Sequence, residues 1–295
     1  MFTSLMSNRL YTTYEDTPSQ GPGTSATAIG RNLSPSLWKH VGGNGITPTG
    51  LGGGAGLFDD FTGGINVAAN GQVGQWIFTE ANVGTAATLA TDAGGVVQLA
   101  SSTTQYDGAS LTGGMVVTLD GDKTATTHKK VIFEARMRKS VITAGSTFVG
   151  LAEYALADVD GVIKDDTGIF VATTDVIGFH VNAATPATLF FTYKASGQTV
   201  QQPITYGTAL TASAWLKVGF IFDPSATDDK RISISIDNEI QSTYVPQSSI
   251  YTMSTDTAVA TFPDAIPMRP VCAVKAETTT ASKLDLDWVA CWQED

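Results

Sequence analysis

The residues whose spacing most suggests chemistry are two aspartates near the C-terminal end. Asp285 and Asp287 flank a single apolar residue in the segment 283–293, so an extended strand would place both carboxyl groups on one face. Retaining glycoside hydrolysis uses two carboxyl groups about 5–5.5 Å apart. The pair belongs to the last strand and has no third glutamate beside it. An outward polar face with ion pairs is therefore the favoured interpretation, and hydrolysis is the alternative.

A second group of carboxylates lies in the segment 158–166. Asp158, Asp160 and Asp165 supply oxygen ligands of the kind that Ca²⁺ prefers. The spacing differs from that of an EF-hand loop, which has Gly at its sixth position, and Lys164 adds a positive charge. The segment is a calcium candidate, with a solvated acidic turn as the favoured interpretation.

Aromatic side chains in or near expected loops could stack on sugar rings, because they present an apolar face. Trp76, Tyr154 and Tyr206 form the candidate set. The alternative for each is ordinary packing in the core or at its rim.

The remaining reactive residue types show no catalytic or metal-binding pattern. His40, His128 and His180 match no metal-binding pair, so we expect structural roles for them. Nucleophile-elbow, P-loop and dinucleotide fingerprints do not occur. Cys272 and Cys291 are expected as buried thiols, and a disulfide would need neighbouring strands with Cα atoms within about 7 Å. We predict a protein that is not an enzyme and has no cofactor.

The composition restricts the classes of partner that the protein could bind. The 295 residues are 42% apolar but only 15% charged, which favours turn-rich β-structure with a weakly charged surface. The net charge of −11 argues against nucleic acid, because phosphate binding needs clustered basic residues. No apolar window approaches the ~18 residues of a membrane span, and the N-terminus lacks a secretion signal. We expect a soluble chain, made in the cytoplasm, that does not insert into membranes.

Strand patterns recur from Phe58 onward, separated by clusters of Gly, Asn and Asp. They lie at 131–138, 147–152, 176–181, 189–193, 215–223 and 232–236. Asp237 and Asn238 follow the last of these where a two-residue hairpin turn needs residues that tolerate positive φ. The pattern predicts an all-β protein with two antiparallel sheets in residues 57–295.

The segment 283–293 alternates like a closing strand. Strict alternation predicts one face with Leu284, Leu286, Trp288, Ala290 and Trp292. The other face would carry Asp285 and Asp287 together with Val289 and Cys291, two apolar residues that are less typical of a polar face.

Residues 1–56 form an extended N-terminal arm rich in Gly and Pro, with one short helix expected at 34–41. Ser34 is its predicted N-cap, and Gly follows the helix. Two helical turns would present Leu37, Trp38 and Val41 together. So short a helix is marginal alone, so these anchors must dock on the chain's own domain or on a neighbouring subunit.

The order of these strands resembles the concanavalin A-like lectin/glucanase jelly roll, which includes laminin-G-like modules. The resemblance rests on the strands at 133–136, 148–151, 215–223 and 232–236, the Asp237-Asn238 turn and the closing strand. It covers roughly residues 58 to 293. It implies the jelly-roll fold and, since fold alone does not give function, no activity.

The arm, with the stretch 28–38, is also similar in style to structural proteins of tailed bacteriophages. This similarity implies a non-enzymatic capsid decoration protein on the virion surface, assembled in the host cytoplasm. Its partners would be further copies of itself and the major capsid protein or other virion proteins. The alternative is a lectin-like module that recognises a host glycan.

Overall fold

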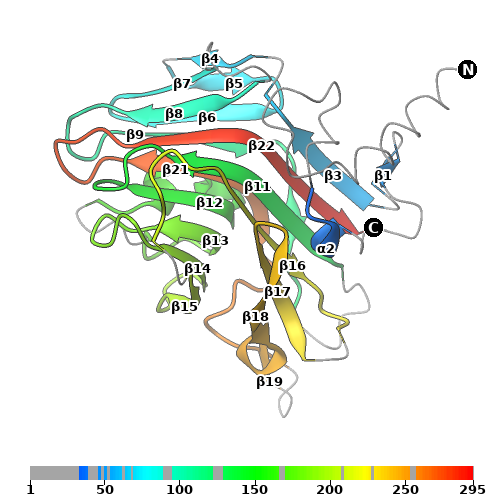
Figure 1. The fold of residues 1–295 in the computed structure, drawn as a ribbon. Coiled ribbons are helices and arrows are strands. Elements are labelled where there is room, and N and C mark those ends of the chain that lie inside the picture. The colour runs from blue at the N-terminus through cyan, green and yellow to red at the C-terminus, as the bar shows by residue number, and fades with distance from the viewer. Residues whose placement is uncertain are drawn as a thin grey trace, which may run out of the picture.

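The protein is a sandwich of two antiparallel β-sheets with a common apolar core (Figure 1). The computed structural model describes residues 33–38, 46–47, 50–51, 54–61, 64–67, 69–88, 95–121, 129–165, 170–206, 209–226, 229–252 and 257–294. This architecture confirms the predicted all-β jelly roll.

In one sheet, called sheet I, some adjacent strands are consecutive in the sequence and others are joined by long crossovers. Its strands in spatial order are β15 (Gln201–Thr205), β14 (Leu189–Lys194), β13 (Val176–Val181), β12 (Ser146–Glu153), β21 (Pro267–Lys275), β9 (Gly108–Gly113), β6 (Trp76–Ala81) and β5 (Gly71–Val73). The short β10 (Val117–Thr118) pairs with β21.

The facing sheet, called sheet II, holds the predicted hairpin and the closing strand. Its strands in spatial order are β18 (Glu239–Pro246), β17 (Lys230–Ile236), β16 (Leu216–Phe222), β11 (Val131–Lys139), β22 (Lys283–Glu294), β8 (Val97–Ser101), β7 (Gly84–Thr88) and β4 (Asn66–Val67). β3 (Gly54–Asp59) pairs with the C-terminal half of β22.

The smaller elements lie outside the two sheets. They are α2 (Pro35–Trp38), the pair β1 (Ile46–Thr47) and β2 (Gly50–Leu51), the 3₁₀ turns Tyr154–Leu156 and Gln247–Ser249, α3 (Val159–Val162), and the pair β19 (Tyr251–Thr252) and β20 (Thr257–Ala258). In the described part of the chain, no helix has the length and apolar character needed to cross a bilayer.

Aromatic side chains from both sheets meet in the middle of the core. Phe133 and Phe220 of sheet II stack with ring centroids 5.8 Å apart, and Phe220 meets Phe191 of sheet I edge to face at 5.5 Å. Phe191 in turn contacts Phe179 at 5.3 Å. Such pairs add to the free energy gained by burying the rings, so this chain of contacts helps to hold the two layers together.

The hairpin between β17 and β18 confirms the sequence prediction. Asp237 and Asn238 have φ values of 48° and 74°, and Ile236 pairs with Glu239 across the turn. Both residues tolerate the left-handed region, which a two-residue hairpin turn requires. The turn therefore fixes the register that sends Ile232, Ile234 and Ile236 into the core.

The predicted faces of the closing strand are wrong beyond Leu286. Arg136 of β11 pairs with Trp288 whereas Met137 pairs with Leu286, so Asp287 is an extra residue in β22. Such a β-bulge reverses the alternation that follows it. Leu284, Leu286, Val289 and Cys291 therefore face the core, while Trp288, Ala290 and Trp292 join a separate cluster on the outer side of sheet II.

The two cysteines confirm the expected burial but lie on opposite sheets. Cys272 belongs to β21 of sheet I and Cys291 to β22 of sheet II, and both are free. Burial raises the pKa of both thiols, which makes their reactive thiolate forms scarce.

The outer side of sheet I is covered by the chain's own residues 154–165 and 170–175. Ala157, Val159, Val162 and Phe170 of this cover pack on Phe148, Ala152, Val176, Val271 and Ala273 of the sheet. Lys194 fastens one end, because its Nζ donates to the carbonyls of Ala172 and Thr174 at 2.7 and 2.9 Å.

His180 lies under this cover, between two phenylalanines. Its ring stacks on Phe190 and meets Phe170 edge to face, with centroids 5.2 and 5.0 Å away. Its Nδ1 lies 2.9 Å from the Thr192 hydroxyl. Burial lowers the pKa of His180 from 6.5 to about 4, so the ring is neutral near pH 7.

We expect His180 to make the fold acid-sensitive. Between pH 6.5 and about 4 the unfolded chain binds a proton at His180 and the folded chain does not, so the free energy of unfolding falls as the pH falls. The full shift corresponds to roughly 3 kcal/mol. Denaturant unfolding of the wild type and of His180→Gln at pH 7 and pH 4.5 measures it. The variant should lose part of the pH dependence, and equal dependence in the two proteins would contradict the assignment.

Candidate docking site for the N-terminal segment

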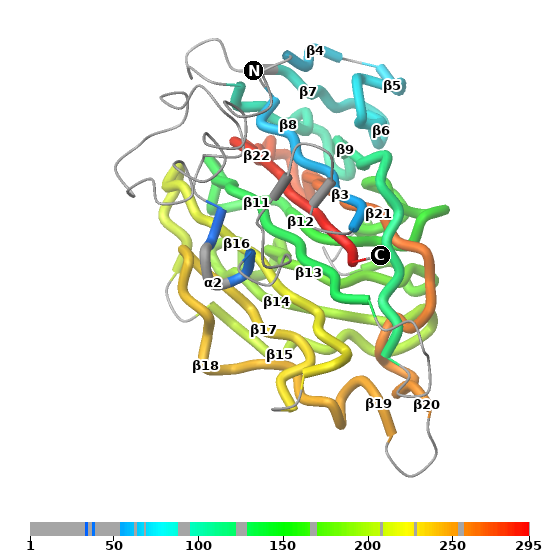
Figure 2. Tube along the Cα trace, turned by 90° about the vertical axis from the view of Figure 1, so that its right-hand side faces the viewer, coloured from blue at the N-terminus to red at the C-terminus, as the bar shows by residue number. Residues whose placement is uncertain are grey.

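A buried carboxylate on the outer side of sheet II receives the N-terminal segment. Glu134 of β11 is 0% exposed. The Ser34 backbone N–H donates to its two oxygens at 3.0 and 3.2 Å, and the Trp38 Nε1–H donates to Oε2 at 2.7 Å. Figure 2 shows α2 beside β16 on this side of the molecule. A buried charge needs such donors, because the unpaired group would be costly.

An apolar wall surrounds the carboxylate. Leu33, Leu37 and Trp38 of the segment are buried. They form one cluster with Ile132, Ile221, Trp288, Ala290 and Trp292, and Phe58 packs against its side. We call the site formed by Glu134 and these six sheet residues the arm recess. Burying one Trp and two Leu side chains contributes several kcal/mol at about 25 cal/mol per Å².

The absence of a side chain at Gly219 makes room for Leu37. Gly219 of β16 lies directly opposite Glu134 in the sheet. A Cβ at this position would lie 2.6 Å from Leu37 Cδ1 and 2.9 Å from the Phe133 carbonyl oxygen. A side chain at this position would therefore force Leu37 to shift and would press on the backbone of β11.

Polar groups at the rim extend the contact to the hairpin turn. The Ser34 hydroxyl donates to Asn238 Oδ1 at 2.9 Å, and Lys217 Nζ donates to the same oxygen at 2.9 Å. Burial raises the pKa of the Glu134 carboxyl, while the hydrogen bonds from Ser34 and Trp38 and the charge of Lys217 oppose that rise. Thus the segment supplies most of the groups that stabilise the ionised form.

The predicted anchors are placed as follows. Leu37 and Trp38 lie in the arm recess of their own chain, and Val41 lies outside the described residues. The helix begins at Pro35 as expected, and its backbone N–H groups at Leu37 and Trp38 donate to the Ser34 carbonyl. The Ser34 hydroxyl donates to Asn238 Oδ1. Docking on a neighbouring subunit stays a prediction.

Sequence reasoning missed Glu134, Leu33 and Gly219 as parts of this site. The available signal was Ile132, an apolar residue on the same outer face as Glu134. An apolar residue and an acid that share the outer side of a central strand indicate that something covers them.

The aspartates considered for catalysis are held in ion pairs. Asp285 Oδ2 accepts from Arg138 Nε at 2.7 Å, and Asp287 Oδ2 accepts from Arg136 Nη1 at 2.6 Å. Gln98 Nε2 also donates to Asp285 Oδ1 at 2.7 Å. Both aspartates are buried. This arrangement matches the outward polar face with ion pairs that was favoured over hydrolysis.

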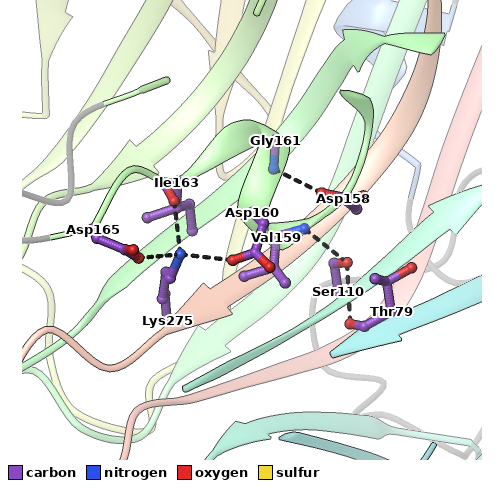
Figure 3. A network of polar contacts seen from close by, with 9 residues as sticks. All are labelled: Thr79, Ser110, Asp158, Val159, Asp160, Gly161, Ile163, Asp165 and Lys275. Carbon is purple, nitrogen blue, oxygen red and sulfur yellow. Dashed lines mark hydrogen bonds and ion pairs between the residues drawn. The ribbon is translucent and has the colours of Figure 1, made fainter. Parts of the chain in front are cut away.

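Two of the three aspartates considered for calcium, Asp160 and Asp165, bind a lysine (Figure 3). Lys275 Nζ lies 2.9 Å from Asp160 Oδ1, 2.6 Å from Asp165 Oδ1 and 3.1 Å from the Ile163 carbonyl oxygen. Asp158 is the N-cap of α3 and accepts from the Gly161 N–H at 2.7 Å. Among the residues with described positions, no group of three His, Cys, Asp or Glu is arranged for a metal ion.

The carboxylates of Asp160 and Asp165 explain why a buried lysine is stable at position 275. Lys275 is 2% exposed. Burial alone would lower its pKa, but Asp165 and Asp160 outweigh burial, and the pKa is raised. The ammonium group therefore occupies the place that a cation would take between the two carboxylates, and it fastens the other end of the cover on sheet I.

The structure does not bring the three aromatic candidates for sugar stacking together. Trp76 is a core residue whose Nε1–H donates to Asp59 Oδ2 at 2.8 Å, so its ring is not available to a ligand. Tyr206 packs against the edge of the core. Tyr154 is 48% exposed and carries the Arg269 guanidinium 3.5 Å from its ring centroid.

The histidines can be placed only in part. His180 has the structural role expected of it, as described above for the cover of sheet I. His40 and His128 lie outside the described residues.

Comparison with solved structures supports the fold. A laminarinase from Rhodothermus marinus matches with a TM-score of 0.50 and 11% identity, over 80% of this chain and 95% of that chain. The Emp47p carbohydrate recognition domain matches with a TM-score of 0.49 and 12% identity, over 81% and 95%. The protein SO2946 of unknown function from Shewanella oneidensis MR-1 gives 0.48 and 14%, over 93% and 96%.

No protein-family model and no curated protein sequence matches the chain. The laminarinase match, at 11% identity, supports the fold alone. The chain therefore has the concanavalin A-like lectin/glucanase jelly-roll fold.

We expect Trp38→Phe to weaken the docking of residues 33–38 while keeping an aromatic ring at position 38. The change deletes the hydrogen bond from Nε1 to Glu134, and leaving a buried acceptor without its partner costs about 1–3 kcal/mol. Hydrogen exchange of residues 33–38, followed by mass spectrometry, should become faster. Trp215→Phe is the control, because Trp215 contacts Arg136 and Arg138 and not the segment. Equal protection of the segment in both variants would refute the role of the Trp38 N–H.

We expect Gly219→Ala to destabilise the protein, because the new Cβ would lie too close to Leu37 Cδ1 and to the Phe133 carbonyl oxygen. Overpacking of this kind costs about 1–3 kcal/mol. Adding Leu37→Ala should cost less in this background than in the wild type, because it relieves the contact between the new Cβ and Leu37 Cδ1. Chemical denaturation of the four proteins measures the coupling. Gly71→Ala, where the nearest atom lies 3.9 Å away, is the control. Full additivity would argue against the fit described here.

Proposed function

We propose that this chain is a non-enzymatic structural protein that works through its N-terminal arm. The observation that carries the proposal is the segment Leu33–Trp38, whose apolar side chains and donors fill a recess with a buried glutamate. Six residues of a long arm make both the apolar and the polar contacts. A short segment that docks in this way is typical of an element that attaches one protein body to another. The sandwich would be the body that this element attaches.

The acidic residues support a non-catalytic role. Asp285 and Asp287 each accept from an arginine on the same side of sheet II. A general acid in a glycosidase needs a raised pKa and access to the scissile bond. Two buried aspartates, each paired with a guanidinium, favour structural use of these carboxylates.

The setting that we propose is the capsid surface of a tailed bacteriophage, with the protein as a decoration protein. The partners would be further copies of the chain and the major capsid protein or another virion protein. This part of the proposal rests on the style of the arm and on the weakly charged composition. The remaining alternative, a glycan-binding module, keeps Tyr154 as its exposed aromatic residue.

Co-sedimentation with capsid shells of the phage that carries the gene tests the proposal. We expect the wild type to sediment with the shells, and Trp38→Ala to lose most of this binding because its arm is no longer fixed in the recess. Trp215→Ala is the matched control and should still bind. A wild-type chain that stays in the supernatant and binds an immobilised glycan, with loss of that binding in Tyr154→Ala, would contradict the proposal and support the alternative.

A further inference from the structure

We propose that a small cavity beside β19 binds one monovalent anion of about the size of chloride. The cavity lies where β16 ends and β17 begins, and its polar side chains are those of Arg231, Gln247 and Tyr251. Its volume is about 20 Å³. Since one water molecule needs about 10–15 Å³, the cavity can hold a single small particle. The site shares no residue with the arm recess, and the inference goes beyond the proposed function.

Tyr251 brings a buried hydroxyl to this cavity. Its ring packs in the core between the sheets, and the residue is only 2% exposed. The hydroxyl has no hydrogen-bond partner among the described residues. A buried polar group without a partner destabilises the fold. A ligand in the cavity that accepts a hydrogen bond would therefore remove this cost.

Arg231 brings a positive charge to the same cavity. Its Nη2 donates to Gln247 Oε1 at 2.6 Å, and its Nη1 donates to the Ala226 carbonyl. Both acceptors are neutral, and no ion pair of Arg231 occurs within the described ranges. A guanidinium group has five N–H donors, so further donors remain for a ligand.

Carboxylates on neighbouring segments have other partners. Asp223 Oδ2 pairs with Lys130 Nζ at 3.2 Å. Asp264 Oδ1 accepts from the backbone N–H of Gly121 at 2.6 Å. A ligand anion, and not a carboxylate of the described residues, is therefore the group that can neutralise Arg231.

The lining favours an anion over a water molecule. A buried water donates as well as accepts, and it typically makes about three hydrogen bonds. Gln247 Oε1 already accepts from Arg231. The other side chains of the lining are apolar, namely Phe222, Pro224 and Ile250. An anion only accepts, so it can take hydrogen bonds from both Arg231 and Tyr251, and such charge-assisted bonds are the stronger kind.

The bound anion would connect two elements that meet at this end of the sandwich. Arg231 belongs to β17 of sheet II, whereas Tyr251 belongs to β19, which lies outside both sheets. A ligand that binds the folded chain and not the unfolded chain stabilises the fold. The melting temperature should therefore depend on which anion is present and at what concentration.

Crystals of the full-length chain grown with sodium bromide locate the ion directly, because bromine scatters X-rays anomalously. We expect an anomalous peak in the cavity, within hydrogen-bonding distance of the Tyr251 hydroxyl and the Arg231 guanidinium. Density for water in the cavity, without an anomalous signal, would overturn the proposal.

Thermal unfolding tests binding in solution, with sodium chloride compared against sodium gluconate at equal ionic strength. Gluconate is too large for the cavity. We expect chloride to raise the melting temperature by about 2–4 °C in a curve that saturates. Tyr251→Phe keeps the ring but removes the donor, so it should lose most of this rise. Tyr244→Phe, which removes a hydroxyl from β18 outside the cavity, is the control and should keep the rise.

The sign of the Tyr251→Phe effect also depends on the anion. In gluconate the variant should melt at or above the wild type, because it lacks a buried donor without a partner. In chloride it should melt below the wild type. An equal chloride response of the variant and the wild type would show that no anion binds at Tyr251.

Replacement of the positive charge gives an independent test. Arg231→Gln should abolish the saturating response to chloride. Lys230→Gln removes the neighbouring charge, which lies over the Tyr244 ring and not in the cavity, and this variant should keep the response. Loss of the response in both variants would attribute it to general charge screening and refute the site.

Discussion

The extra residue in β22 is the constraint on which both sides of sheet II depend. Because Asp287 is bulged, the same twelve-residue strand gives Leu284 and Leu286 to the core before the bulge and Val289 and Cys291 after it. The reversal turns Trp288 and Trp292 outward, where they build the wall of the arm recess. A regular strand would bury these tryptophans between the sheets and leave two small apolar residues outside.

The buried carboxyl group of Glu134 adds a second constraint, because its oxygens need the donors of the arm. Apolar residues alone would accept many segments, whereas a carboxylate with two oxygens requires donors at fixed places. Ser34 and Trp38 supply them, and Gly219 sets the depth at which Leu37 can sit. The recess therefore selects one short sequence.

The charged groups that were candidates for catalysis or metal binding instead stabilise the outer faces of the two sheets and the segment that covers sheet I. Arg136 and Arg138 bind the two aspartates of β22, and Lys275 binds Asp160 and Asp165. Lys194 and Lys275 hold the cover of sheet I at two places. Each sheet thus has a segment of the chain on its outer side, and the polar contacts explain why these segments stay in place on apolar strands.

The strands, the hairpin turn and the sandwich could be predicted from the sequence, because alternation and turn residues are local properties of the chain. The regular spacing of Ile232, Ile234 and Ile236, followed by Asp237 and Asn238, is a clear case. The bulge at Asp287 could not be predicted, since its position depends on pairing with β11, a strand about 150 residues away. For the same reason, only Leu37 and Trp38 of the arm recess could be predicted from the sequence. Glu134, Gly219 and Trp288 become neighbours only when β11, β16 and β22 pair, and these strands are far apart in the sequence.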